Sequence, residues 1–381
     1  MLKQVWREEI VNASNIYRIL GARWYAQGLF IKDTKSGHEI RAERVYRVHQ
    51  GDFVYNRLFA WKGSFALANT DDHLCCVSNE FPCFEIDATR IDPRFLWCYF
   101  SRGNVWKKAL GLSVGGTPTS RNRLNESRFL GLEIPLPPLP EQRRVVARIE
   151  ELAERIGEAQ GLRQQSFDEV QALFEQCRAT VFQAASGTSV VALEQLATLE
   201  RGKFSHRPRN EPRFFGGNHP WIQIAEIERS NKFIREWNTT LNDDGLAISK
   251  KFPKGTVLVS IAATIGATGI LAFDCCVPDS IVGVTPRTGI DSEFLYHYLG
   301  YVRTHLESVA PQSAQKNINL QILAPLPAPQ LPLVEQRKIV AYLDQLEVAV
   351  DALANVQGET AAELDALLPA ILDRAFKGEL V

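Results

Sequence analysis

The sequence lacks both a strong net charge and a recognisable metal-binding cysteine pattern. Its 381 residues carry a formal charge of only −1, so any surface that binds nucleic acid has to be a local basic one. The seven cysteines show no CxxC spacing and no histidines at zinc-finger distance. They are typical of reduced core thiols, which indicates a cytoplasmic protein.

A membrane-spanning segment is also missing. Residues 257–273 form one uncharged run, but the run is short, rich in β-branched residues and interrupted by Gly266 and Gly269. We expect two buried strands around a glycine turn there. The first ten residues are charged and lack the apolar core of a signal peptide, so neither export nor a membrane partner is expected.

Motifs of catalysis are missing as well. The sequence contains no GxxxxGK[ST] loop for a nucleoside triphosphate, no glycine-rich cofactor fingerprint and no Asn/Asp-Pro-Pro-aromatic motif of an amino-methyltransferase. Pro278-Asp279 begins like a nuclease signature but lacks the acidic-x-Lys element, so an isolated turn is the simpler interpretation. These absences favour a binding protein with no catalytic residue and with no cofactor or metal of its own.

What the sequence does contain is an internal repeat. The segment PLPPLPEQRRVVARIEELAERI from Pro135 returns as PLPAPQLPLVEQRKIVAYLDQL from Pro325, and Glu141-Gln142-Arg143 matches Glu335-Gln336-Arg337 at an offset of 194 residues. The offset then holds without a gap. Upstream, the segment 91–96 resembles 290–295, and the two Cys-Cys pairs lie 200 residues apart. The chain is therefore a duplication.

Each repeat closes on a long helical pattern. Apolar residues step by three and four, which is the spacing of a coiled-coil seam, so two long antiparallel helices are expected to pack on each other. Pro369 falls inside the second pattern and predicts a kink or a restart. The equivalent seam positions are Ile149, Leu152, Ile156, Val170, Leu173, Cys177 and Val181, and Leu343, Leu346, Val350, Leu364, Leu367, Ile371 and Ala375.

Upstream of each helix lies a mixed, β-rich domain. Strands are expected at Trp221–Ile227 and Thr256–Ile261, and short helices at Phe95–Tyr99 and Phe294–His305. The fold class is α+β, with two similar mixed β-rich domains separated by the two long helices in a pseudo-twofold repeat. The boundaries are residues 1–134 for the first domain, 135–188 for the central helix, 189–324 for the second domain and 325–381 for the C-terminal helix.

Four groups of polar residues are candidate DNA contacts. The basic run 201–213 offers cations for phosphates and guanidiniums for guanine edges, although a solvated loop is the simpler alternative. Polar islands at 313–317 and 117–123 occupy equivalent places before each proline-rich exit, and a fourth group follows Tyr55. The candidates are Lys203, His206, Arg207 and Arg209; Ser313, Gln315, Lys316 and Asn317; Thr119, Ser120, Arg121, Asn122 and Arg123; and Arg57, Lys62 and Ser64.

This layout resembles the sequence-specificity subunit of type I restriction-modification enzymes. The paired PLP…EQR segments, the long heptad helices and the terminal LLPAILDRAFKGEL from Leu367 carry the resemblance. It implies two target-recognition domains, each reading one half of a split target in double-stranded DNA. It also implies two methyltransferase subunits as partners, restriction subunits bound through the complex, and S-adenosylmethionine, ATP and Mg on those partners.

The helices would then act as a spacer. A helix from Pro140 to Ala185 is about 70 Å long, which limits the distance between two DNA readers to roughly 20 base pairs. Two alternatives stay open. The first is a helical scaffold that bridges proteins and touches DNA non-specifically, and the second is a DNA-modifying enzyme of an unfamiliar type.

Overall fold

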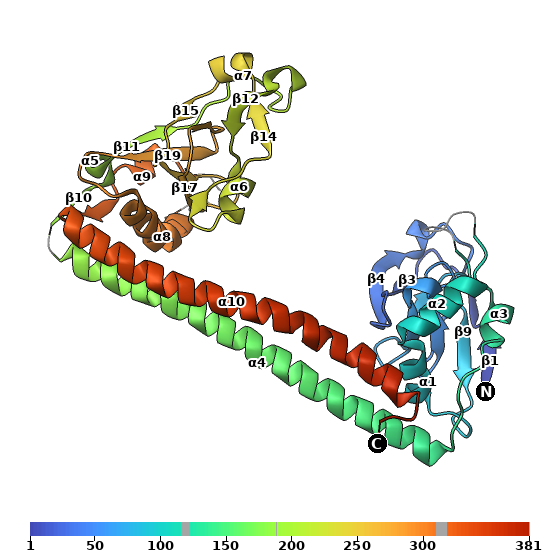
Figure 1. Cartoon of the computed structure of the whole chain (residues 1–381). Helices are drawn as coiled ribbons and strands as arrows, with labels where there is room; N and C mark the ends of the chain where they lie inside the picture. Colours follow the sequence, from blue (N-terminus) through green and yellow to red (C-terminus); the bar gives the residue numbers. More distant parts are fainter. Residues whose placement is uncertain (116–121, 188, 310–317, 381) are drawn as a thin grey trace. The chain divides into compact units, whose positions relative to one another are not determined.

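The computed structural model describes residues 1–115, 122–187, 189–309 and 318–380 (Figure 1). The chain divides into two compact units, of which unit 1 contains residues 1–164 and 357–381 and unit 2 contains residues 165–356. Each unit therefore holds one β-rich domain together with parts of both long helices.

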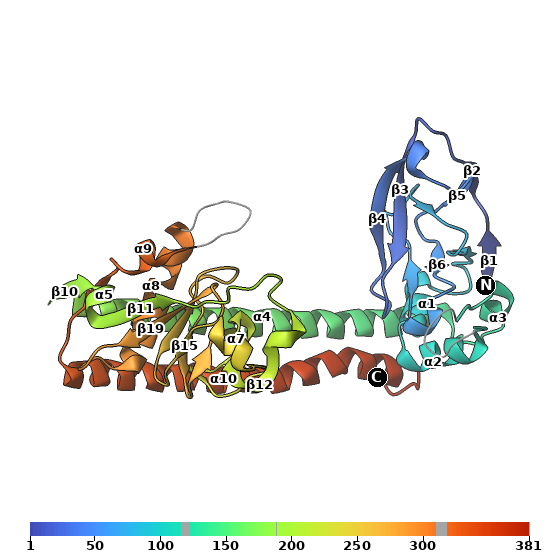
Figure 2. The same ribbon diagram turned by 90° about the horizontal axis from the view of Figure 1, so that it is seen from above.

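Unit 1 contains two sheets. The first has the strand order β1-β9-β6-β7 and the second β2-β5-β8-β3-β4. All pairings are antiparallel except that of β3 with β8, and Figure 2 shows β3 and β4 side by side. The strands are β1 (Leu2–Val5), β2 (Glu8–Ile10), β3 (Ile16–Ala22), β4 (Leu29–Ser36), β5 (Arg44–Arg47), β6 (Phe53–Tyr55), β7 (Phe65–Leu67), β8 (Cys76–Val77) and β9 (Cys83–Ile86).

Aromatic rings fill the core of unit 1. Phe53, Tyr55 and Phe84 from the first sheet pack on Phe129, and the chain returns from the end of the second long helix to place Phe376 against Phe95, with ring centroids 4.8 Å apart. The short helices are η1 (Gly37–Glu39), η2 (Ala60–Lys62), α1 (Pro93–Phe100), α2 (Gly103–Leu112) and α3 (Glu126–Leu130). The C-terminal segment is thus an integral part of the first domain.

Unit 2 contains two larger sheets and a short ribbon. Their orders are β11-β19-β16-β17-β13, β14-β12-β18-β15 and β10-β20. The strands are β10 (Val190–Ala192), β11 (Ala197–Arg201), β12 (Phe215–Trp221), β13 (Phe233–Ile234), β14 (Thr239–Leu241), β15 (Lys251–Phe252), β16 (Val257–Ser260), β17 (Thr268–Leu271), β18 (Cys275–Cys276), β19 (Ile281–Pro286) and β20 (Pro327–Pro329). The short helices are α5 (Leu193–Leu196), η3 (Pro212–Phe214), α6 (Ile224–Arg229), α7 (Asp243–Ala247), α8 (Ser292–Val309) and α9 (Leu320–Leu323).

The two units repeat one strand topology. The order β11-β19-β16-β17 in unit 2 reproduces β1-β9-β6-β7 in unit 1, and β15-β18-β12-β14 reproduces β5-β8-β3-β4. Even the parallel pair recurs, because β12 runs parallel to β18 as β3 does to β8. The predicted duplication is therefore present in the fold as well as in the sequence.

The long helices are α4 (Leu139–Ser186) and α10 (Leu333–Ala375). Within unit 1 they run antiparallel, since Gln160 donates to Asp365 at 2.8 Å while Arg163 reaches the carbonyl of Gln357. The restart expected at Pro369 does not occur, because α10 continues across it.

Two repeat-related positions of the predicted seam are exposed. Leu173 and Leu367 are 57% and 44% exposed, whereas the other predicted seam residues are at least half-buried. Apolar spacing alone does not distinguish a buried seam position from an exposed one. Leu367 still lines a groove together with the seam residues Leu152 and Ile156 of the other long helix.

Several local predictions are confirmed and others are wrong. The uncharged run forms the antiparallel strands β16 and β17, with Gly266 at φ +76° before the second strand. Residues 221–227 are not one strand, because β12 ends at Trp221 and α6 begins at Ile224. The apolar segment 318–323 contains the helix α9, for which Asn319 is the N-cap. Among the described residues, no helix is long and apolar enough to cross a bilayer, and the cytoplasmic location stays a prediction.

The cysteines behave as predicted. All seven are free thiols and six are buried. Burial raises the pKa of Cys83 and Cys98 to about 12, so these thiols stay protonated and unreactive at neutral pH.

Candidate nucleic-acid interface

The basic segment of the second domain, residues 201–213, is fastened at its base to the turn between β18 and β19. The N–H of Gly202 donates to the carbonyl of Ile281 at 2.9 Å, and that of Lys203 donates to Val277 at 3.1 Å. A Cβ atom at position 202 would lie 2.2 Å from the carbonyl oxygen of Pro278. Only glycine permits this close approach of the two segments.

The aromatic residues of this segment are anchors rather than DNA-facing groups. Phe204 is only 2% exposed and packs against Phe214 and Trp221, with ring centroids 5.8 and 5.2 Å away. His206 is half-buried and lies 4.8 Å from the ring of Phe214. The apolar side chains therefore fix the loop while the cations between them stay exposed.

One acidic residue organises the exposed arginines. The two carboxylate oxygens of Asp279 accept from Arg207, at 2.9 Å, and from Arg209. The backbone carbonyl of Asp279 accepts from Nε of Arg201. Lys203 is exposed, and no ion pair to its ammonium group is found within the described ranges. In the sequence, Pro278-Asp279 indicates only an isolated turn, and an acidic residue in a turn gives no signal that three arginines converge on it.

The first-domain candidates near Tyr55 have mainly structural contacts. Arg57 is 8% exposed, donates to the carbonyl of Asn79 at 2.6 Å and forms an ion pair with Glu126. Burial raises the pKa of Glu126, but hydrogen bonds, above all that from Arg57, outweigh it and hold the pKa below its usual range. Ser64 is fully buried and donates to the carbonyl of Ala22. The expected DNA contact therefore does not fit Arg57 or Ser64, because both side chains are enclosed and bound.

Other first-domain candidates remain closer to the surface. Lys62 is half-buried, with its ammonium nitrogen 3.6 Å from the ring centroid of Trp24. Arg123 is also half-buried and donates to Glu80 at 2.9 Å, whereas its neighbour Asn122 is buried. The remaining predicted contacts lie outside the described residues: Thr119, Ser120, Arg121, Ser313, Gln315, Lys316 and Asn317.

A polar network joins the second domain to the part of α10 in unit 2. His297 is fully buried, and its Nε2 lies 2.7 Å from Asp344, to which Lys232 donates at 2.6 Å. Glu347 completes a group of three possible metal ligands with His297 and Asp344. The ammonium group of Lys232 already supplies the positive charge that these carboxylates need, so the geometry favours an ion-paired network over a metal site.

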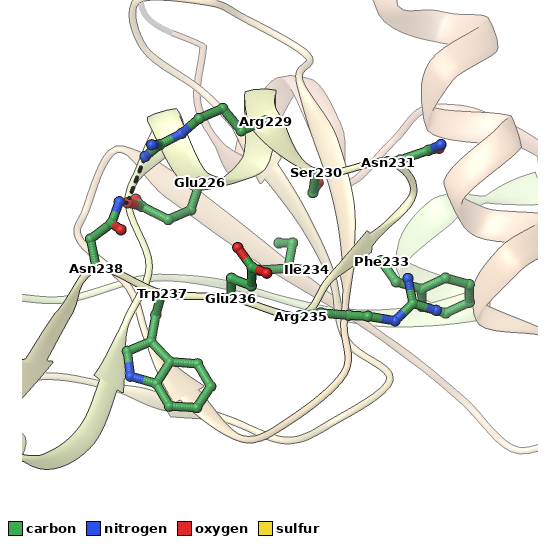
Figure 3. A pocket seen from close by; sticks show the side chains of 10 residues that line it. All are labelled: Glu226, Arg229, Ser230, Asn231, Phe233, Ile234, Arg235, Glu236, Trp237 and Asn238. Atoms are coloured by element: carbon green, nitrogen blue, oxygen red, sulfur yellow. Dashed lines mark hydrogen bonds and ion pairs between the residues drawn. The ribbon is translucent and has the colours of Figure 1, made fainter. Parts of the chain in front are cut away.

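A pocket of about 300 Å³ lies in the connection between β12 and β14 (Figure 3). Its wall includes Glu226, which accepts from Arg229 at 3.0 Å and from Asn238 at 2.9 Å. Trp237 lines the same pocket and is 44% exposed. The equivalent connection in unit 1, between β3 and β4, is only a short turn, which is why the sequence repeat does not mark this site.

The fold and the site together define a class: a duplicated α+β protein in which each repeat joins two small sheets to a long helix, with an exposed arginine cluster on the second repeat. The family described as "Type I restriction modification DNA specificity domain" matches residues 46–165 and 186–359. The chain belongs to this family.

Individual relatives agree with the family match. The putative type I restriction enzyme MjaX specificity subunit of Methanocaldococcus jannaschii is 20% identical over 374 residues, covering 91% of this chain and 83% of that protein. A chain from a structure described as the basis of complex assembly and conformational transition of the type I R-M system has 26% identity and a TM-score of 0.74, with 99% and 98% coverage. The HsdS subunit from Thermoanaerobacter tengcongensis, at 24% identity, 99% and 97% coverage and a TM-score of 0.56, shares the fold.

Proposed function

We propose that this chain is the DNA sequence-specificity subunit of a type I restriction-modification complex, and that each repeated domain reads one block of a split, asymmetric target. The observation that carries the proposal is the repeated strand topology combined with dissimilar loops. Two domains with the same fold but different loops suit a target whose two halves differ. A scaffold that only bridges proteins would not need an arginine cluster on one of the two domains.

In the second domain the DNA contacts are assigned to Lys203, His206, Arg207 and Arg209. Lys203 and the two arginines are exposed, and guanidinium groups suit guanine edges as well as phosphates. In the first domain they are assigned to the half-buried Lys62 and Arg123 and to the polar island at 119–121. The equivalent island at 313–317 is assigned to the second domain. Asn122 is as buried as Arg57 and is not assigned.

The long helices would set the gap between the two blocks. Helix α4 has 48 residues and α10 has 43. At about 1.5 Å per residue these lengths are about 72 and 65 Å, which limits the gap to roughly 20 base pairs. The number of base pairs is expected to be smaller where the reading loops do not lie at the helix ends.

Exposed apolar residues on the helices support docking of two equal partners. Leu162 and Leu367 of unit 1 are 65% and 44% exposed, and their repeat equivalents in unit 2, Val356 and Leu173, are 56% and 57% exposed. Each unit thus exposes apolar side chains at the same two repeat positions, which supports equivalent docking surfaces on the two units. We assign these surfaces to two methyltransferase subunits.

Catalysis would belong to the partner subunits. We assign no catalytic residue to this chain and expect S-adenosylmethionine on the methyltransferase subunits, with ATP and Mg on the restriction subunits that join through the complex. The chain's own contribution is the choice of sequence and the fixed distance between the two recognised blocks.

The test is affinity selection from a library of random DNA duplexes. The chain is assembled with its methyltransferase subunits, and bound duplexes are recovered and sequenced over several rounds. We expect two short invariant blocks at one fixed gap. Recovery of duplexes without a common motif would overturn the proposal in favour of a scaffold with non-specific DNA contact.

A further inference from the structure

We propose that Asp279 is a specificity-determining residue of the second domain, because it restrains Arg207 and Arg209 from binding DNA phosphates while it orients Arg209 toward a base edge. This inference rests on the function proposed above. It concerns a residue that does not itself need to touch DNA, so Asp279 is a positioning residue.

The position of Asp279 is fixed by the core on both sides. The preceding Val277 and the following Ile281 are fully buried, and Ile281 donates to the carbonyl of Pro278 at 3.1 Å. The side chain of Asp279 is 26% exposed, less than the two guanidiniums that it binds. A carboxylate on such a rigid turn is a fixed acceptor rather than a mobile surface charge.

The two arginines are held in different ways. Arg207 also donates through NH1 to the carbonyls of Phe204, at 2.6 Å, and His206, at 2.9 Å. Its guanidinium is therefore bound on several edges and clamps the loop. The contact described for Arg209 is the one through its NH2 group to Asp279, and its side chain is 47% exposed. Because a guanidinium has five N–H donors, Arg209 keeps an edge for a second acceptor.

The charge of the pair determines which DNA groups it can bind. The single carboxylate of Asp279 neutralises part of the positive charge of the two guanidiniums. A DNA phosphate is therefore attracted to them less strongly than it would be to two unpaired arginines. A guanine edge offers neutral acceptors, O6 and N7, which a planar fork can bind while its other edge stays on Asp279. The pairing of Arg207 and Arg209 with Asp279 thus weakens sequence-independent binding to DNA phosphates more than it weakens recognition of bases.

The experiment measures binding of the assembled complex to three duplexes between 50 and 200 mM salt. One duplex carries both selected blocks, and in each of the other two one block is scrambled. For Asp279→Asn we expect tighter binding to the scrambled duplexes, with a salt slope steeper by about 0.9 for each guanidinium released to a phosphate. Discrimination of one block only should fall about tenfold, within the range of a bidentate base contact.

Two further variants separate the pairing from the net charge and from unfolding. Asp274→Asn removes an exposed carboxylate at the other end of β18, where it pairs with Lys251 at 3.3 Å. This variant should leave the ratio of the affinities for the intact and the scrambled duplexes unchanged. Asp279→Glu keeps the charge and should keep the wild-type salt slope. If Asp279→Asn matches wild type, or changes binding only as Asp274→Asn does, the inference is wrong. If the wild-type complex itself does not discriminate between the duplexes, the proposed function fails instead.

Discussion

The side-chain oxygen of Gln142 accepts a hydrogen bond from the backbone N–H of Asp92 at 2.8 Å. Gln336 makes the same bond to Asp291, also at 2.8 Å. Both glutamines are fully buried, and each amide nitrogen donates to two further backbone carbonyls. The repeated Glu-Gln-Arg motif therefore fastens the start of each long helix to the domain before it.

Loss of either glutamine should destabilise its own unit. Gln142→Ala and Gln336→Ala remove three hydrogen bonds and leave buried backbone groups unpaired, so we expect losses of about 2–4 kcal/mol each in the free energy of unfolding. Denaturant unfolding measures this. Gln176→Ala, at an exposed position of α4, is the control and should change stability by less than about 0.5 kcal/mol. Equal small effects for all three variants would contradict the fastening role.

Substitution of the arginines should affect one half of the target. Arg209→Ala should weaken recognition of the block read by the second domain by about 1–3 kcal/mol, the range of a bidentate base contact. Arg207→Ala should act on the same block and also loosen the loop, because its guanidinium holds two backbone carbonyls. Arg229→Ala, an exposed arginine paired with Glu226, is the control. Binding to duplexes with each block scrambled measures the effect, and equal loss at both blocks would indicate unfolding.

The stability of unit 2 should depend on pH through His297. Burial, together with the nearby charges of Lys232 and Arg178, lowers the pKa of His297 to about 4, although Asp344 opposes the shift. Because the unfolded chain binds the proton more tightly, this group's contribution is complete above about pH 6.5 and is lost as the pH falls toward 4, a difference of about 3 kcal/mol.

The internal repeat supplies the variant that tests this dependence. Position 297 corresponds to the buried Cys98 of the first domain, so His297→Cys places there a residue that the fold already accepts. Its free energy of unfolding should change less between pH 6.5 and 4 than that of wild type. His305→Cys, at an exposed site on the same helix, should retain the wild-type slope. If the free energy of unfolding of His297→Cys depends on pH as steeply as that of wild type, the pH dependence arises from other groups.

Longer helices should widen the gap between the two blocks. Seven residues inserted after Gln164 and seven after Val356 add about 10 Å, or about three base pairs, and keep the apolar spacing. The two sites lie opposite each other, since Arg163 contacts the carbonyl of Gln357. Insertion into α4 alone should abolish sequence-specific DNA binding rather than widen the gap. Selection from random duplexes measures the gap, and the same gap with both insertions would refute the spacer role.

The sequence predicts the repeated parts of this molecule better than the dissimilar ones. Helices α4 and α10 follow directly from apolar spacing and an ungapped offset, and α1 and α8 lie where short helices were expected. The connection between β12 and β14 was missed, because α6 and β13 are set by tertiary contacts such as those of Lys232 with Asp344. A short apolar stretch such as 221–227 fits either a strand end or a helix start.

The candidate site was predicted in composition but not in detail. Clustering of Arg207 and Arg209 is visible in the sequence, whereas their common partner Asp279 is 70 residues or more away along the chain. Arg57 is a candidate because it is a basic residue near a loop, but the sequence does not reveal that it is buried and paired with Glu126. Long-range pairing of charges decides which cations remain available for DNA.

The most direct test of the central claim is a map of methylated positions in genomic DNA modified by this chain together with the methyltransferase subunits proposed as its partners. We predict one motif of two short, different blocks separated by a fixed gap. A single continuous motif, or modification without a common sequence, would contradict the account of two repeated domains that read two unlike halves.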